Sequence, residues 1–337
     1  MTKRAIKRKL VISGFSFVLL LTLLILALGS CQDSYLTQAV AGHLRIMHAR
    51  QPIKKILKQD NIDRKTKGKL QMVLDVRAFA TKELGLPDNK SYTLYSDIKS
   101  DYLGWNVYCT PRFSVEPKTW CYPIAGCVVY HGYFKKDKAL KFASEMNEQG
   151  LDVYVSGFSA YSTLGWYNDP ILSTNLRYDS VDLAGLIIHE LAHQKLYRKG
   201  DSRFSEGFAE TVERAGVLRW LRSLGRTDQV EQALKSWEQS DQAVDRMLKA
   251  RNDLNAIYQS KADTTWMLNK KDSILNELGK DLNIKNKRLN NAYLVPISTY
   301  HSMIPYFQSI LDSCGGDFRQ FYDKVKRLRL GSTEIST

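Results

Sequence analysis

Two histidines and a glutamate stand together in the segment IIHELAHQKL, residues 187–196. His189 and His193 are four residues apart, and Glu190 directly follows the first histidine. The apolar residues around them recur at helical spacing, which predicts a helix over about 182–196. Residues four apart lie on one face of a helix, so both imidazoles can bind one metal ion. In this H-E-x-x-H pattern zinc activates a water molecule for hydrolysis, and the glutamate is placed to move the proton of that water.

Three more carboxylates lie in FSEGFAETVE, residues 204–213, where the spacing predicts a second helix over about 204–222. Glu206 and Glu210 are four residues apart and face one way. One of them can bind the metal while the other holds the far nitrogen of a ligand histidine, and Glu213 is a further candidate for that supporting role. Two histidines and one carboxylate suit a single Zn²⁺ ion.

These segments carry a resemblance to known families. SEGFAETVE resembles the N-E-G-F-A block that supplies the third zinc ligand in the glutamate-zincin peptidases, and this match makes Glu206 the ligand. Ser205 stands where those peptidases have Asn. Taken in order, several blocks resemble a family of bacterial predicted zinc aminopeptidases that are often lipoproteins: CYPIAGCVVYHGYF, AYSTLGWYNDPILST, IIHELAHQKLY, FSEGFAETVE and NNAYLVPISTYHSMIPYF. The resemblance implies a zincin-like fold and a peptide substrate. The G-x-M-E-N block of the larger aminopeptidases is absent from the sequence.

Peptide hydrolysis also needs a hydrogen-bond donor for the oxyanion of its tetrahedral intermediate. Zincins often supply a Tyr or a His. Tyr300, in the last of the resembling blocks, and Tyr161, in the turn-rich loop before the H-E-x-x-H segment, are the two candidates. The chain has 18 tyrosines, so composition alone does not choose between them.

Other helices and strands must position these residues. Helical spacing recurs over residues 35–50 and 63–84, over about 137–149, as a charged pair of long helices within 228–281, and over 291–329. Short aromatic and β-branched runs between about 90 and 165 indicate strands: YTLYS, WNVYC, CVVYHGYF and LDVYVSG. The prediction is one α+β domain over residues 31–337, with N-terminal helices over about 35–90, a small sheet and the zinc-binding helices over 90–225, and a helical part over 226–337.

The N-terminal sequence is typical of an export signal. MTKRAIKRK is basic, and an uncharged apolar run and the sequence LGSC follow it. A retained membrane-spanning helix is the alternative. Leu28-Gly29-Ser30-Cys31 resembles the lipobox of bacterial lipoproteins, which implies a signal peptide at residues 1–30 and a lipid on Cys31. Gln32, rather than Asp, follows the cysteine, and in Gram-negative bacteria this implies an outer-membrane lipoprotein facing the periplasm.

Charge and cysteines agree with an exported protein. The formal net charge is +14, but no nucleic-acid motif is present, so a basic surface beside anionic lipid is the preferred interpretation. Outside the cytoplasm cysteines can oxidise, and Cys121 and Cys127 could close a short loop; buried free thiols are the alternative.

The sequence thus predicts a zinc metallopeptidase, an aminopeptidase by resemblance, with Glu190 as general base. A different class of protein remains as an alternative: an envelope scaffold or binding lipoprotein whose zinc only braces the fold. Structural zinc sites usually have four protein ligands, whereas this motif offers three and a glutamate placed for catalysis.

Overall fold

The computed structural model describes residues 35–122, 126–160, 167–260, 262–284, 289–299 and 303–328. The chain divides into two compact units, Met1–His48 and Ala49–Thr337. Of the first unit the structure describes one helix, α2 (Tyr35–His48). The predicted signal peptide and Cys31 lie outside the described residues. Among the helices that are described, none combines the length and the apolar character that a membrane span requires.

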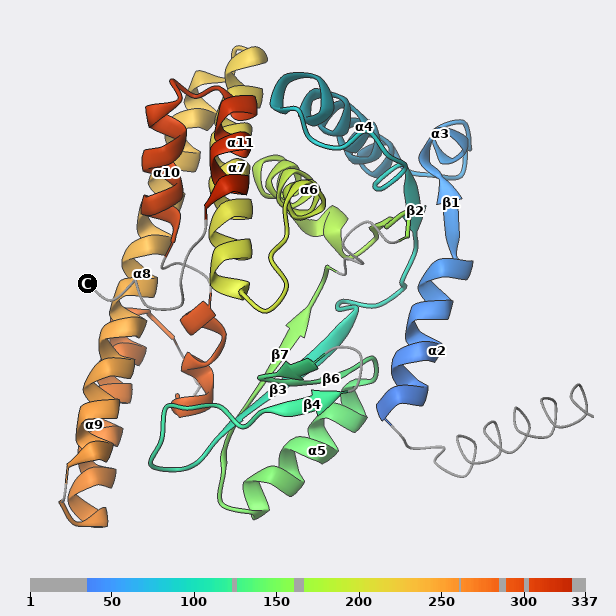
Figure 1. Cartoon of the computed structure of the whole chain (residues 1–337). Helices are drawn as coiled ribbons and strands as arrows, with labels where there is room; N and C mark the ends of the chain where they lie inside the picture. The colour runs from blue at the N-terminus through green and yellow to red at the C-terminus, as the bar shows by residue number, and fades with distance from the viewer. Residues whose placement is uncertain are drawn as a thin grey trace, which may run out of the picture. The chain divides into compact units, whose positions relative to one another are not determined.

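The second unit is an α+β structure in which helices predominate (Figure 1). Its helices are α3 (Ile53–Ile56), α4 (Arg64–Leu84), α5 (Lys136–Glu148), α6 (Ser180–Lys195), α7 (Ser202–Ser223), α8 (Thr227–Gln259), α9 (Thr264–Asp281), α10 (Ile304–Ser313) and α11 (Phe318–Arg327). Short 3-10 turns cover Asn175–Arg177, Asn291–Leu294 and Pro296–Thr299. The α+β class predicted from the sequence is confirmed.

The strands form three small sheets rather than the single sheet that was predicted. The first sheet has the order β1-β2-β8 (Arg50–Pro52, Leu94–Ser96, Ile171–Leu172), with β2 and β8 parallel. The second has the order β6-β3-β7 (His131–Tyr133, Gly104–Thr110, Asp152–Phe158) and is antiparallel throughout. The third is the hairpin of β4 (Trp120–Tyr122) and β5 (Gly126–Val128). The strand-like runs were therefore identified, but their partners were not.

The largest apolar core surrounds α6. Leu183, Ile187, Ile188 and Leu191 of this helix are fully buried, in one cluster with side chains from α4, α7, α10 and α11. Figure 1 shows α6 between α4 and α7. A helix that is buried on most of its surface needs apolar residues on several faces, which explains the apolar flanks of the two histidines. Side chains in a close-packed core sit in low-energy rotamers, so we expect α6 to be a rigid support.

The charged segment 227–281 forms an antiparallel pair, α8 and α9, as predicted (Figure 1). This pair is tied to the second sheet by a buried ion pair between Lys271 Nζ of α9 and Asp152 Oδ2 of β7. The same carboxylate oxygen accepts a hydrogen bond of 2.9 Å from the backbone N–H of Asn291. A buried charge is tolerated when its partners satisfy it, and here one carboxylate joins three elements.

Candidate metal centre

Helix α6 presents both histidines to the start of α7. It begins at an N-cap, Asp179, whose side chain accepts hydrogen bonds from the backbone N–H groups of Val181 (2.8 Å) and Asp182 (2.9 Å). The chain turns between the two helices at Gly200, whose φ of +83° is a conformation that favours glycine. Asp201 caps α7 by accepting from the backbone N–H of Phe204. The caps and the turn together fix where Glu206 enters relative to the histidines.

Ser205, which stands where the resembling peptidases have Asn, secures this turn. It is fully buried, and its hydroxyl accepts from the backbone N–H of Arg198 (3.1 Å) and lies 3.0 Å from the carbonyl oxygen of Asp201, to which it donates. A serine therefore supplies both an acceptor and a donor to the connection between the helices.

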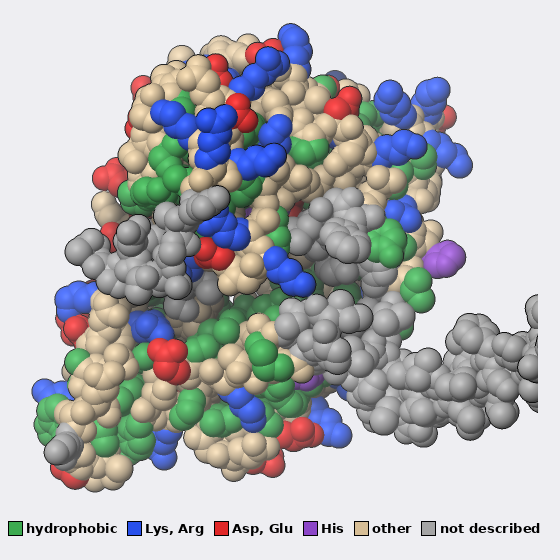
Figure 2. Space-filling view, in the orientation of Figure 1, with side chains coloured by type: hydrophobic (Ala, Val, Ile, Leu, Met, Phe, Trp, Pro, Cys, Tyr) green, Lys and Arg blue, Asp and Glu red, His purple; other side chains and the backbone are tan. Residues whose placement is uncertain are grey.

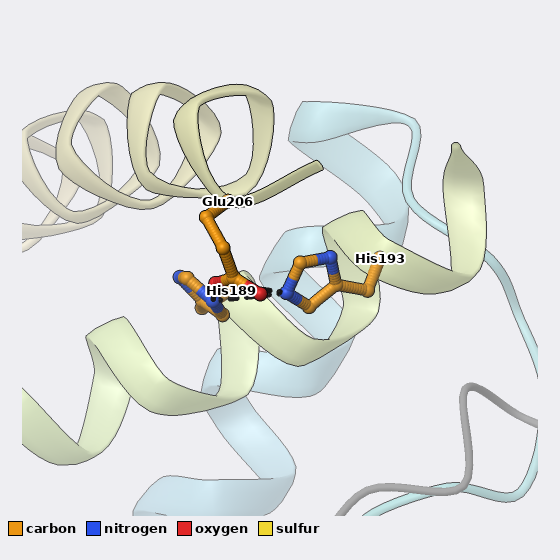
Figure 3. A group of neighbouring side chains, drawn as sticks. All are labelled: His189, His193 and Glu206. Carbon is orange, nitrogen blue, oxygen red and sulfur yellow. Dashed lines mark hydrogen bonds and ion pairs between the residues drawn. The ribbon is translucent and has the colours of Figure 1, made fainter. Parts of the chain in front are cut away.

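His189, His193 and Glu206 converge on one point (Figure 3). His189 Nε2 is 3.2 Å from Glu206 Oε2 and 3.1 Å from His193 Nε2, and His193 Nε2 is 3.5 Å from Glu206 Oε2. Tetrahedral coordination with ligand bonds of about 2.1 Å separates the donor atoms by about 3.4 Å. The three distances lie on both sides of that value, so the residues fit one ion of zinc size.

Glu213 contacts the far side of the His189 ring. Its Oε2 is 2.9 Å from Nδ1 of His189. When that nitrogen carries the proton and donates it to the carboxylate, Nε2 of the neutral ring keeps its lone pair for a metal. Gly185 makes the approach possible, because a Cβ at this position of α6 would lie 2.6 Å from Glu213 Oε1.

Ionisation at the cluster follows from burial and pairing. Burial alone would lower the pKa of His189, but hydrogen bonds with Glu206 and Glu213 outweigh it and raise that pKa well above its usual value. Burial would raise the pKa of Glu206, but the two histidines lower it to about 2. Glu206 is therefore a carboxylate at neutral pH, whereas the raised pKa of His189 favours a protonated ring that must release a proton when a metal ion binds.

A cavity of about 680 Å³ opens onto the cluster. Glu190 lines it beside His189, and among the described residues its carboxylate has no hydrogen-bond or ion-pair partner. The cavity is also lined by Tyr130, Tyr178, Asp182, Leu186, His193, Tyr197, Glu206 and Glu213. Glu190 is thus free to accept a proton from a molecule in the cavity.

Glu210 lies elsewhere. Its Oε1 accepts a hydrogen bond of 2.6 Å from Arg214, and the same guanidinium binds both carboxylate oxygens of Asp241 on α8. Of the two supporting glutamates that were predicted, Glu213 contacts a histidine, and Glu210 instead joins an ion-pair network between α7 and α8.

The remaining predicted residues divide into two groups. Tyr161, Tyr300 and Cys31 lie outside the described residues. Cys121 and Cys127 form a disulfide bond across the β4–β5 hairpin, while Cys109 and Cys314 are buried free thiols.

Three tyrosines that were not predicted as site residues line the cavity: Tyr130, Tyr178 and Tyr197. The ring of Tyr197 lies 5.9 Å from that of His193, just beyond the end of α6. Its place at the end of the resembling block IIHELAHQKLY was a signal for Tyr197 that was not used.

The family model described as "Putative aminopeptidase" matches residues 34–335, which is most of the chain. The chain belongs to this family. No curated protein matches the chain. No solved structure matches it either. The matched region contains the whole cluster and the cavity, so the histidine and glutamate residues described above lie in the part of the chain that the family shares.

Proposed function

We propose that this protein is a zinc-dependent aminopeptidase of zincin-like fold that acts on peptides in the bacterial envelope. The observation that carries the proposal is the triangle of His189, His193 and Glu206 donor atoms at 3.1, 3.2 and 3.5 Å. Family membership supports peptide substrates and cleavage at the amino end. A zinc ion is the metal that this donor set suits best.

Each side chain has a distinct part in the proposed reaction. His189, His193 and Glu206 would hold the ion, which when bound supplies Lewis-acid activation of water and of the peptide carbonyl. Glu190 accepts the proton of the attacking water and then donates it to the leaving amine. Glu213 holds His189 in the orientation and tautomer that a ligand needs.

A catalytic site is favoured over a structural one. Within the described residues, the group that could hold an ion has three members, and it opens onto a cavity. Structural zinc sites are closed by four protein ligands, whereas catalytic sites keep one position for water. The scaffold alternative would need a fourth protein ligand, and it has no use for the Glu190 carboxylate, which has no partner among the described residues.

Two variants separate metal binding from catalysis. Glu190→Gln keeps the three ligands, so we expect about one zinc per chain and at least a hundredfold loss of kcat on peptides. Glu206→Ala removes a ligand, so we expect loss of both the zinc and the activity. Zinc content and peptide hydrolysis are measured together on the soluble form, residues 33–337. Undiminished turnover by Glu190→Gln would exclude the mechanism, and full zinc content in Glu206→Ala would exclude Glu206 as a ligand.

A further inference from the structure

A second cavity adjoins the catalytic one. It has a volume of about 590 Å³ and lies between the end of α6 and α11. Tyr197 lines both cavities, and its ring is 5.9 Å from the ring of His193. The two cavities are therefore neighbours that share Tyr197 as a lining residue.

The two cavities carry opposite charge. The catalytic cavity has four carboxylates and, among its described lining residues, no Lys or Arg. Bound to a divalent ion, this set still leaves negative charge in the cavity. The second cavity is lined by Lys195, Arg198 and Lys326 against a single carboxylate, Asp323. Figure 2 shows Lys and Arg side chains gathered over α10 and α11 on this face.

The three cations of the second cavity keep their charge available. Lys195 Nζ donates to the carbonyl oxygen of Gly85 at 2.9 Å, and the Arg198 guanidinium donates to that of Leu328 at 2.8 Å. The Arg198 guanidinium also lies 3.6 Å from the centre of the Phe204 ring. These contacts position the side chains without neutralising them, because carbonyl oxygens carry no net charge. Within the part of the chain that the structure describes, neither residue forms an ion pair, and nor does Lys326.

We propose that the second cavity binds the C-terminal carboxylate of a short peptide whose amino end occupies the acidic cavity. The inference rests on the proposed function and names its substrate class. A free peptide is positive at its amino end and negative at its carboxyl end, which matches the charge of the two cavities in order. An extended residue spans about 3.5 Å, so the proposed substrate is a peptide of a few residues that runs from the cluster past Tyr197 to the basic cavity.

C-terminal amidation isolates this interaction. Di-, tri- and tetrapeptides of the same sequence are compared as free acids and as amides on the zinc-loaded protein. Amidation removes the charge and leaves the scissile bond unchanged. For the length that reaches the cavity, we expect kcat/KM to fall about tenfold, mostly through KM, since a hydrogen bond to a charged group is lost.

Two lysines of α11 provide a matched pair of variants. Lys326→Gln, at an exposed position of the cavity, should reduce the preference for the free acid about threefold, as expected for one exposed charge. Lys324→Gln makes the same change in charge on the same helix. Lys324 donates to Ser313 Oγ at 3.0 Å and does not line the cavity, so this variant should keep the full preference. Arg198→Gln is a second test, with a larger expected loss because Arg198 is half-buried.

The outcomes separate the two proposals. Equal kcat/KM for acids and amides at every length would overturn the role of the cavity and leave the peptidase intact. An equal loss of preference in the Lys326 and Lys324 variants would also overturn it, since only general charge would be at work. If neither form is hydrolysed, the proposed function fails, and equilibrium binding of acid and amide decides the cavity: tighter binding of the acid supports it, and equal binding refutes it.

Discussion

Among single residues, Glu213 does most to distinguish a built metal site from a chance meeting of two histidines and a glutamate. Two imidazoles whose Nε2 atoms are 3.1 Å apart both need their lone pairs directed inwards to bind one ion. The Glu213 carboxylate, 2.9 Å from Nδ1 of His189, favours the tautomer in which Nε2 of that ring keeps its lone pair. Nδ1 of His193 is buried and has no partner among the described residues, so Glu213 is the only such support in that part of the chain.

Removal of Glu213 should therefore weaken metal binding without removing a ligand. We expect Glu213→Ala to raise the zinc dissociation constant by about 10- to 100-fold, the usual effect of losing a group that holds a ligand histidine. Competition with a chelator of known affinity measures it. Glu210→Ala is the control on the same helix, because Glu210 binds Arg214 and contacts neither histidine in the described structure. Unchanged zinc affinity in the Glu213 variant, or an equal loss in both, would contradict the assignment.

The grouping of His189, His193 and Glu206 was predictable because its signals are local. A spacing of four places His189 and His193 on one face of α6. The information that decides between Glu210 and Glu213 as the partner of His189 is not local in the sequence. From Glu206, the fourth residue on is turned by about 40° around a helix and the seventh by about 20°, so both share its face. Which one meets His189 depends on how α7 crosses α6, and the sequence of α7 alone does not contain that information.

Between elements, the crossing of α6 and α7 depends on glycines. Gly185 of α6 faces Glu213, and Gly216 of α7 faces Leu84 of α4 and Ile188 of α6. A glycine inside a helix costs about 1 kcal/mol relative to alanine, so each of these positions gives up helix stability. At Gly185 the space gained is occupied by the Glu213 carboxylate, which joins helix packing to the proposed metal site.

Alanine at position 185 should separate stability from metal binding. Its Cβ would meet the end of the flexible Glu213 side chain at 2.6 Å rather than backbone, so the fold should tolerate it while the carboxylate moves away from His189. We expect zinc affinity to fall about tenfold in Gly185→Ala, with an unchanged or higher Tm. In a Glu213→Ala background, Gly185→Ala should cause no further loss of zinc affinity, because the carboxylate that it displaces is absent.

Gly68→Ala supplies the comparison for helix stability. Gly68 lies within α4 with nothing within 4 Å of an added Cβ, so this variant should raise Tm and leave zinc affinity unchanged. Full zinc affinity in Gly185→Ala, or an additive loss in the double variant, would show that Gly185 does not act through Glu213.

Elements with strong local signals were predicted well, and pairing between distant segments was not. The apolar periodicity and the capping residue Asp179 mark α6, and Gly85, with φ of +67°, ends α4. Strand β8 is only two residues long and lies just after a loop rich in turn residues, so its own sequence hardly marks it. It becomes a strand because β2, far away in the chain, offers hydrogen bonds in parallel register.

At the scale of the whole molecule, the net charge and the N-terminal segment indicate where the proposed reaction takes place. We propose that residues 1–30 are a signal peptide and that Cys31 carries a lipid, which would hold a basic protein beside anionic headgroups. One acyl chain gives only weak membrane binding, so a multiply acylated cysteine or an added basic surface is needed for stable attachment. Without the five basic residues of the proposed signal peptide, the net charge falls from +14 to +9, which is of the right sign to contribute.

The proposed lipid anchor can be tested by substituting Cys31 and the residue that follows it, Gln32. In a Gram-negative host, we expect the full chain to incorporate labelled fatty acid and to sediment with outer membranes. Cys31→Ser should abolish the label, because the acceptor thiol is lost. Gln32→Asp should keep the label and move the protein to the inner membrane, as the lipoprotein sorting pattern implies. A membrane-bound Cys31→Ser variant of uncleaved mass would instead identify residues 10–28 as a retained spanning helix, since such a helix needs no lipid to stay in the bilayer.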